Sequence, residues 1–193
     1  MWPWEHAALG YLVFSLVIHA LYRRSPTGAS ALVLLVGTQL PDLVDKPLSW
    51  GLELFPVGFA VAHSVFVAVP FALACTLLAR RHGRAKLGVA LLVGYWSHLL
   101  GDVLSPLRSG GEPAMGRILW PLVEYESYGD DLGLARGLVY IREYVAEVAA
   151  TGLTTALALS LALTALAVSL WAVDGFPGVA WLFRRIHRGG AGE

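Results

Sequence analysis

Residues 87–104 read LGVALLVGYWSHLLGDVL, and this stretch holds the main features of the chain. It approaches the length that a helix needs to cross the hydrocarbon core of a bilayer, about 20 mostly apolar residues. His98 and Asp102 are the only His, Asp, Glu, Lys or Arg residues in this stretch. They are four positions apart, so on a helix their side chains lie on one face, about 5 to 6 Å from each other. The stretch therefore predicts a membrane helix that presents a His/Asp pair to a cavity or a partner helix.

Four further apolar stretches extend the prediction to a bundle: residues 6–22, 29–41, 57–79 and 146–173. The stretch 29–41 is short for a span, and a buried or re-entrant segment is the alternative. Pro41 is expected to end its helix. We predict an all-α integral membrane protein with one domain, residues 1–193, built as a bundle of about five transmembrane helices.

Two segments are expected outside the spans. The outer loop, residues 105–144, contains turn-forming glycines and prolines, and residues 132–147 are expected to lie amphipathically on the membrane. The C-terminal tail, residues 175–193, combines Trp181 and Phe183 with arginines and is predicted to be an interfacial anchor.

The composition also indicates a membrane protein. Hydrophobic residues make up 56% of the chain, charged residues 15%, and the mean hydropathy is +0.63. Soluble proteins average about 25% charged residues, so the balance excludes an ordinary soluble globule, a disordered chain and a nucleic-acid binder with a basic face. Cys75 is the only cysteine, which excludes an internal disulfide.

The distribution of charge predicts an orientation. Basic residues cluster at 23–24, 80–86 and 184–188, and five spans place all three clusters on one side. That side then carries nine basic and two acidic residues, whereas the other carries five basic and twelve acidic ones. Because basic loops favour the cytoplasm, we expect a multi-pass protein of the plasma (inner) membrane with a cytoplasmic C-terminus. The first residues lack the basic region of a cleavable signal, so the first helix is expected to stay as an anchor.

Six ionisable side chains recur at one depth in the predicted bundle: His6, Asp42, Asp45, His63, His98 and Asp102. Counted from the basic ends of their helices, the three histidines and Asp102 lie roughly 18 to 26 Å along the axis. This depth places them near the outer face. Imidazole and carboxylate ligands suit a divalent metal, so we expect a shared site for one or two ions, with zinc favoured and manganese or iron as alternatives.

Simpler interpretations exist for single residues. His6 alone could be an interfacial or hydrogen-bonded histidine. Asp42, directly after Pro41, could cap a turn. His98 and Asp102 could form a plain intrahelical hydrogen bond. The common depth of all six side chains favours a shared site over these separate explanations.

Separate predictions apply to residues outside this group of six. Ser64, Trp96 and Trp120 are candidates for substrate contact or for support of the ligands, although an aromatic belt at the membrane interface also explains the tryptophans. Glu124 and Glu126 in the outer loop are expected to be exposed rather than ligands. His19, at the opposite end of the first helix, is expected to be solvated or interfacial.

The motifs follow a recognisable order: HAALG at 6–10, LPDLVD at 40–45, AHS at 62–64, GYWSHLLGD at 94–102 and GRILWP at 116–121. This order resembles the YdjM-type family of inner-membrane metal-dependent hydrolases, and the resemblance covers roughly residues 6–125. It implies a small helical membrane protein whose metal site is made from the six side chains above. The family often reads H-R-G-x-T-H where this chain reads GFAVAH at 58–63, so Gly58 replaces the first histidine of that motif.

We therefore expect a metal-dependent hydrolase that acts at the outer membrane interface through activated water. A weaker similarity to the metal site of zinc-dependent phospholipases C points to a phosphoester or lipid-linked substrate. Asp45 is expected to be the catalytic base, since it lies further out on the turn after Pro41 and is the less buried carboxylate, with Asp42 as a metal ligand.

Two other functions remain open at this point. One is a non-enzymatic metal-binding or ion-handling membrane protein, and the other is a structural partner whose polar cluster only ties helices together. Membrane lipid is the expected partner and nucleic acid is not. The sequence leaves the oligomeric state open.

Overall fold

The computed structural model describes residues 1–183, and all regular structure in this part of the chain is helical. The long helices are α1 (Pro3–Tyr22), α2 (Gly28–Lys46), α3 (Val65–Arg81), α4 (Ala85–Leu104), α5 (Arg136–Thr151) and α6 (Thr155–Val173). Short helical turns follow α2 and α4 or lie in the outer loop: η1 (Pro47–Gly51), η2 (Ser105–Ser109), η3 (Met115–Ile118) and η4 (Gly133–Ala135). The predicted all-α class is confirmed.

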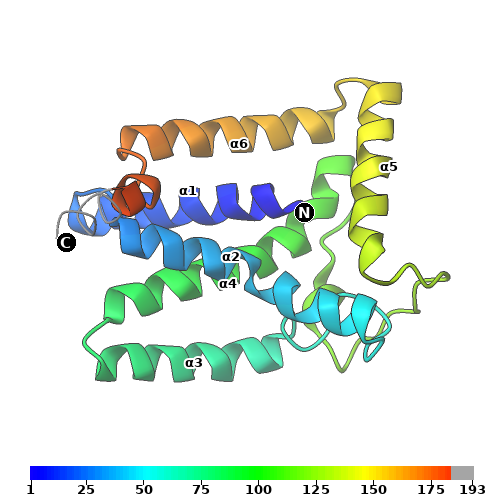
Figure 1. Cartoon of the computed structure of the whole chain (residues 1–193), viewed down its shortest axis with the longest axis horizontal. Coiled ribbons are helices and arrows are strands. Elements are labelled where there is room, and N and C mark those ends of the chain that lie inside the picture. The colour runs from blue at the N-terminus through cyan, green and yellow to red at the C-terminus, as the bar shows by residue number, and fades with distance from the viewer. Residues whose placement is uncertain (184–193) are drawn as a thin grey trace, which may run out of the picture.

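Helices α1, α2 and α4 form the centre of the bundle (Figure 1). Helix α3 packs on the outer side of α4, and α6 packs on the outer side of α1. Helix α5 stands across one end of the bundle (Figure 1). The turns η1 and η4 lie together at that same end.

The most extensive helix contact, between α2 and α4, depends on glycine. A Cβ atom at Gly94 would stand 2.5 Å from the backbone oxygen of Leu34, and one at Gly37 would stand 2.4 Å from that of Leu91. Such distances are too short for any real side chain, so only glycine allows the two backbones to approach this far. The contact brings the last turns of α2 against His98.

The outer surfaces of the helices are apolar. Helix α6 buries only Ser160 and Ala167 against the rest of the protein, and large side chains such as Leu161 and Leu166 are exposed. A soluble protein would turn such side chains inward, whereas lipid tails accommodate them. Among the described residues, three helices are long and apolar enough to cross a membrane: α1, α4 with its extension to Ser109, and α6. The predicted count of about five spans is not confirmed.

Helix α2 extends further than predicted. It was expected over 29–41, but it continues through Pro41 to Lys46. Proline removes a single backbone hydrogen bond, and packed membrane helices tolerate this loss. As a result Asp42 and Asp45 both lie on the helix, one turn apart, rather than on a turn after it.

Two other predicted boundaries were also wrong. The stretch 57–79 becomes helical only at α3, because backbone amides in residues 60–63 donate to the Asp45 carboxylate instead of to a helix. The side chain of Ser64 then caps α3 by accepting a hydrogen bond from the amide of Phe66. The stretch 146–173 is divided between α5 and α6 at Gly152, whose φ of 68° favours glycine. Residues 132–147, predicted to lie amphipathically on the membrane, contain η4 and most of α5, which lies across the end of the bundle; their position on the membrane stays a prediction.

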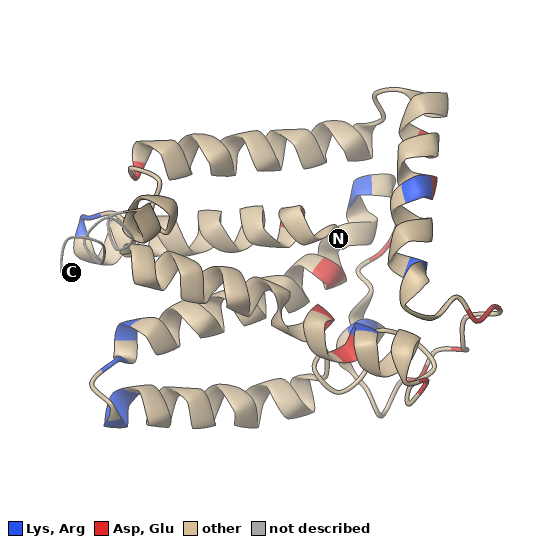
Figure 2. Cartoon of the chain, in the orientation of Figure 1, with Lys and Arg blue, Asp and Glu red and all other residues tan. Residues whose placement is uncertain are grey.

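Charge is divided between the two ends as the sequence indicates. The basic clusters 23–24 and 80–86 lie at one end of the bundle, and most Asp and Glu residues lie at the other (Figure 2). Of the predicted tail 175–193, residues 184–193, including the third basic cluster, lie outside the described residues.

Candidate metal centre

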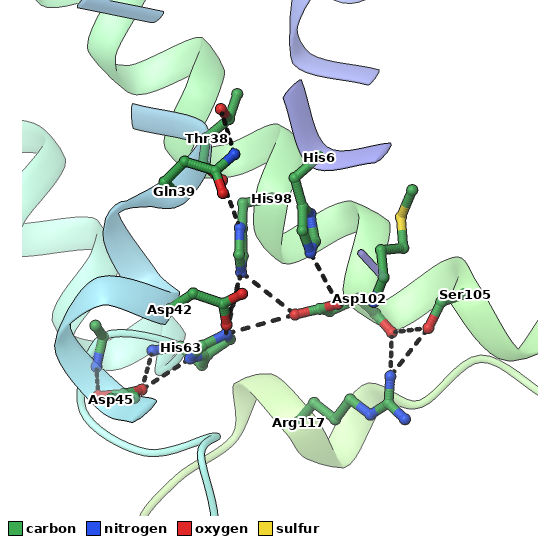
Figure 3. A network of polar contacts seen from close by, with 12 residues as sticks. His6, Thr38, Gln39, Asp42, Asp45, His63, His98, Asp102, Ser105 and Arg117 are labelled. Atoms are coloured by element: carbon green, nitrogen blue, oxygen red, sulfur yellow. Dashed lines mark hydrogen bonds and ion pairs between the residues drawn. The ribbon is translucent and has the colours of Figure 1, made fainter. Parts of the chain in front are cut away.

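Four buried side chains direct one atom each to a common point: Asp42, His63, His98 and Asp102 (Figure 3). The His63 and His98 Nε2 atoms are 3.2 Å apart. Asp102 Oδ2 lies 3.4 Å from the His63 Nε2 and 3.3 Å from the His98 Nε2. Asp42 Oδ1 lies slightly further away, 3.6 Å and 3.7 Å from the same two nitrogens.

These distances match a tetrahedral metal site. Zinc binds histidine nitrogen at about 2.0 to 2.1 Å and carboxylate oxygen at about 2.0 to 2.2 Å, and tetrahedral geometry then separates ligand atoms by about 3.3 to 3.6 Å. The separations found here run from 3.2 to 3.7 Å. Among the described residues, this is the group of His, Cys, Asp and Glu atoms that converges in this way.

The tautomer that each of the two histidines adopts when its ring is neutral is set by the other ring nitrogen. The His98 Nδ1 donates to the backbone carbonyl of Thr38 at 2.7 Å, and the His63 Nδ1 donates to Asp45 Oδ2 at 2.8 Å. Carbonyl and carboxylate oxygens only accept, so both Nδ1 atoms carry the proton. In the neutral imidazole each Nε2 then presents a lone pair to the common point, the arrangement that orients histidine metal ligands.

The centre is therefore short of positive charge. Two nitrogen lone pairs and two carboxylate oxygens meet in a buried space, and Asp42 Oδ1 has no hydrogen-bond partner among the described residues. Converging acceptors repel one another, and burial makes the repulsion costly. A divalent cation supplies what this donor set lacks, so the residues fit a metal. The identity of the metal is not fixed by this geometry.

Comparison with known protein families gives one match. The model described as YdjM inner membrane protein matches residues 1–176. The chain belongs to the YdjM family. It is thus an inner-membrane protein, in agreement with the apolar helices. Neither the curated proteins nor the solved structures contain a match.

Asp45 differs most from its predicted position. We expected it to be the less buried carboxylate of this YdjM family member, but it is fully buried, whereas Asp42 is 8% exposed. Its two oxygens accept hydrogen bonds from the backbone amides of Ala60, Ala62 and His63, each at 2.9 Å, and from the His63 ring. These bonds occupy the carboxylate and keep residues 60–63 out of a helix. Asp45 therefore holds His63 in place instead of facing the metal centre.

His6 lies beside the centre rather than within the group of four. Its ring stacks on His98 with 3.7 Å between the ring centroids. Its Nε2 is 3.3 Å from Asp102 Oδ1, the oxygen that faces away from the common point, and the amino group of Met1 contacts the same oxygen. The predicted ligand is thus a neighbour of Asp102.

The secondary candidates have other contacts. Ser64 donates to the backbone oxygen of Trp120, so its hydroxyl fixes the outer loop. Trp96 packs with the apolar cluster of Tyr95 and Leu99. The Trp120 ring packs edge-on against Phe55. Glu124 and Glu126 are exposed, as predicted.

Two cations next to the centre were missed from the sequence. Lys46 pairs with Asp42 Oδ2. Arg117 donates to the backbone oxygen of Asp102 and to the Ser105 hydroxyl (Figure 3). Its guanidinium lies over the Phe59 ring. The spacing of four between Asp42 and Lys46 was a signal for the first pair. The GRILWP motif at 116–121 contains Arg117 and was the available signal for the second cation, but nothing in its spacing shows that this side chain returns from the outer loop to Asp102.

Proposed function

We propose that this protein is a metal-dependent hydrolase of phosphoesters, with zinc as the favoured metal. The observation that carries the proposal is the convergence of four buried ligand atoms on one point, where Asp42 Oδ1 has no hydrogen-bond partner among the described residues. His63, His98 and Asp102 form a tight triangle, with sides of 3.2 to 3.4 Å, and Asp42 stands slightly apart. Three protein ligands with a further position for water or substrate are typical of catalytic zinc sites.

Asp42 replaces Asp45 as the proposed base. Its Oδ1 faces the common point without a hydrogen-bond partner among the described residues, while Lys46 holds Oδ2. A divalent metal bound here supplies Lewis acidity and lowers the pKa of water towards neutrality. Asp42 Oδ1 then accepts the proton of the attacking water, which the occupied oxygens of Asp45 are poorly placed to do.

The charges around the centre favour a phosphoester over a neutral ester. Lys46 pairs with Asp42 and Arg117 with the backbone oxygen of Asp102, and both are cations that bind phosphoryl oxygens well. Arg117 is held by Asp102 and Ser105, so its position is fixed before substrate arrives.

The test is turnover by the full chain in detergent, with bis(p-nitrophenyl) phosphate as phosphoester and p-nitrophenyl acetate as neutral ester. We expect release of p-nitrophenol from the phosphoester that requires added metal. Asp42→Asn should keep the metal and lose about 10²-fold or more in turnover. His98→Ala is the metal-free control, and phosphoester turnover no higher than in that variant overturns the proposal.

One observation favours a second candidate, a metal-binding protein without hydrolase activity. Asp42 Oδ1 is close enough to serve as a fourth ligand, and zinc sites closed by four protein ligands are structural. Under this alternative Asp42→Asn loses metal, and the wild-type protein binds metal tightly without turnover. The metal content of Asp42→Asn therefore separates the two functions.

We also propose that the end carrying the centre faces outward, because the basic clusters lie at the opposite end (Figure 2). The test uses exposed positions in a Cys75→Ser background. A cysteine introduced at Ser109 should react with an impermeant thiol reagent outside cells, and one introduced at His82 should not. The opposite labelling pattern places the centre on the cytoplasmic side.

A further inference from the structure

A basic surface covers the end of the bundle opposite the metal centre (Figure 2). Two segments form it, the residues that follow α1 and the connection from α3 to α4, and they meet because α1 packs against α4. Its six cations are all exposed: Arg23, Arg24, Arg80, Arg81, Arg84 and Lys86.

The basic surface has no acidic partner within residues 1–183. Each ion pair of a lysine or arginine in this part of the chain involves Lys46, Arg108 or Arg136. Asp174 is the carboxylate at the basic end, but its side chain is fully buried and accepts hydrogen bonds from three side chains of α1. Six cations without a counter-charge create a positive field that attracts anions.

Two of the six cations converge on one aromatic ring. The guanidinium carbon of Arg24 lies 5.4 Å from the centre of the Tyr22 ring, and the Lys86 ammonium lies 6.0 Å from the same centre. Tyr22 is 51% exposed, and its hydroxyl adds a hydrogen-bond donor. Arginine, lysine and tyrosine together form a donor set that suits a phosphate group.

Large apolar side chains border the cations directly. Leu21 is 68% exposed next to Tyr22, and Leu77 is 57% exposed one turn before Arg81. Leu21 belongs to α1, which is long and apolar enough to cross a membrane. The change from leucine to arginine within one turn is typical of the level at which lipid tails give way to headgroups.

This combination distinguishes between two kinds of anion. A soluble polyanion complements the cations but leaves the neighbouring leucines exposed to water. A phospholipid with a net negative charge complements both, since its phosphate meets the cations and its acyl chains cover the leucines.

We propose that the basic surface binds an anionic phospholipid of the leaflet that it faces. The lipid phosphate lies between Arg24 and Lys86, where the Tyr22 hydroxyl donates to it, and the acyl chains lie beside Leu21. The other four cations attract further anionic headgroups around this position. No residue of the metal centre takes part, so the proposal does not depend on the proposed function.

The experiment is native mass spectrometry of the full chain in detergent, titrated with lipids that have identical acyl chains. The probes are dioleoyl phosphatidylglycerol, whose headgroup is anionic, and dioleoyl phosphatidylcholine, whose headgroup is neutral overall. We expect the first lipid to bind at least about tenfold more tightly, because one basic residue beside an anionic headgroup contributes about fivefold. Equal affinity for the two lipids overturns the proposal.

Substitutions test the position at Tyr22. Arg24→Gln and Lys86→Gln should each weaken phosphatidylglycerol binding by about three- to fivefold and leave phosphatidylcholine binding unchanged, whereas Lys86→Arg should keep the wild-type affinity. Arg142→Gln is the matched control, because Arg142 is an exposed arginine of α5 at the opposite end. Wild-type affinity in both glutamine variants of the basic surface, or an equal loss in Arg142→Gln, overturns the site.

Soluble anions are tested as competitors. Inorganic phosphate and polyglutamate are added at constant ionic strength to protein saturated with phosphatidylglycerol. We expect neither to displace the lipid, because neither carries an apolar chain that covers the leucines. Displacement by either competitor assigns the cations to a soluble anion and overturns the lipid proposal.

Discussion

Histidine and aspartate meet at both ends of this bundle, with opposite results. At the end that carries the metal centre, four acceptor atoms face one another and no protein donor lies between them. At the other end, the buried Asp174 carboxylate accepts hydrogen bonds from Tyr11, Ser15 and His19 of α1, each at 2.6 Å. The Asp174 cluster is complete by itself, whereas the cluster at the metal centre lacks a cation.

The comparison teaches that residue types alone do not identify a site. Tyr11, Ser15 and His19 are spaced by four along α1, so they form one stripe that ties this helix to the end of α6. His19, expected to be solvated or interfacial, is a partner of Asp174 and is partly exposed. The balance between donors and acceptors separates a helix contact from a ligand site.

The largest expected effect is a loss of metal binding, which tests the balance between donors and acceptors at the two ends. His63→Ala should weaken metal binding at least about 100-fold, because changes outside the coordination sphere alone cost about 10- to 100-fold. His19→Ala is the matched control and should keep full metal content. Elemental analysis of the purified variants is the measurement, and equal metal in both variants removes the distinction between the two clusters.

The next largest effect is expected from Asp45, whose carboxylate holds the ligand His63 in place. Asp45→Asn weakens the hold on His63, so metal affinity should fall by about 10- to 100-fold, with turnover falling in step. Metal titration and turnover are measured on the same preparation. Full metal content with turnover lost would instead restore Asp45 as the base.

A smaller effect is expected at the Asp174 cluster. Asp174→Ala leaves three donors without their acceptor, so the free energy of unfolding should fall by about 1.5 to 3 kcal/mol while metal content stays unchanged. Thermal unfolding in detergent gives the first quantity. Asp131→Ala, at an exposed position, is the control for loss of a carboxylate. Loss of metal in Asp174→Ala would show that the two ends are coupled.

The smallest expected effect is the pH dependence of the stability that the Asp174 carboxylate contributes. Burial alone would raise the pKa of Asp174, but the hydrogen bonds from Ser15, Tyr11 and His19 outweigh it and hold the pKa below its ordinary value. The ionised carboxylate therefore stabilises the fold above the ordinary aspartate range, and this stabilisation is lost as the pH falls through the lower, folded-state pKa.

The difference in Tm between the wild type and Asp174→Ala should thus be constant from about pH 7 to 5 and shrink below about pH 4. A His19→Gln background in both proteins keeps imidazole titration out of the measurement. A difference that grows as the pH falls would contradict the sign of the shift.

Much of the metal centre was predictable because its geometry is local. His98 and Asp102 are four residues apart on one helix, so their spacing alone indicated a shared face. His63 and Asp42 were placed at the same depth from the lengths of apolar runs. The role of Asp45 was not predictable, because the amides of residues 60–63 that surround it come from a segment that the hydropathy pattern assigned to a helix.

The sequence by itself determined the helical class, the polarity of charge and most members of the metal centre, since hydropathy, periodicity and spacing act within single helices. Only the tertiary structure decided which oxygen of each carboxylate faces the centre and which carboxylate is occupied by backbone amides. These features depend on contacts between segments far apart in the chain. Glycine-mediated packing of α2 on α4 and the return of the outer loop to Asp102 create those contacts, and no local pattern encodes them.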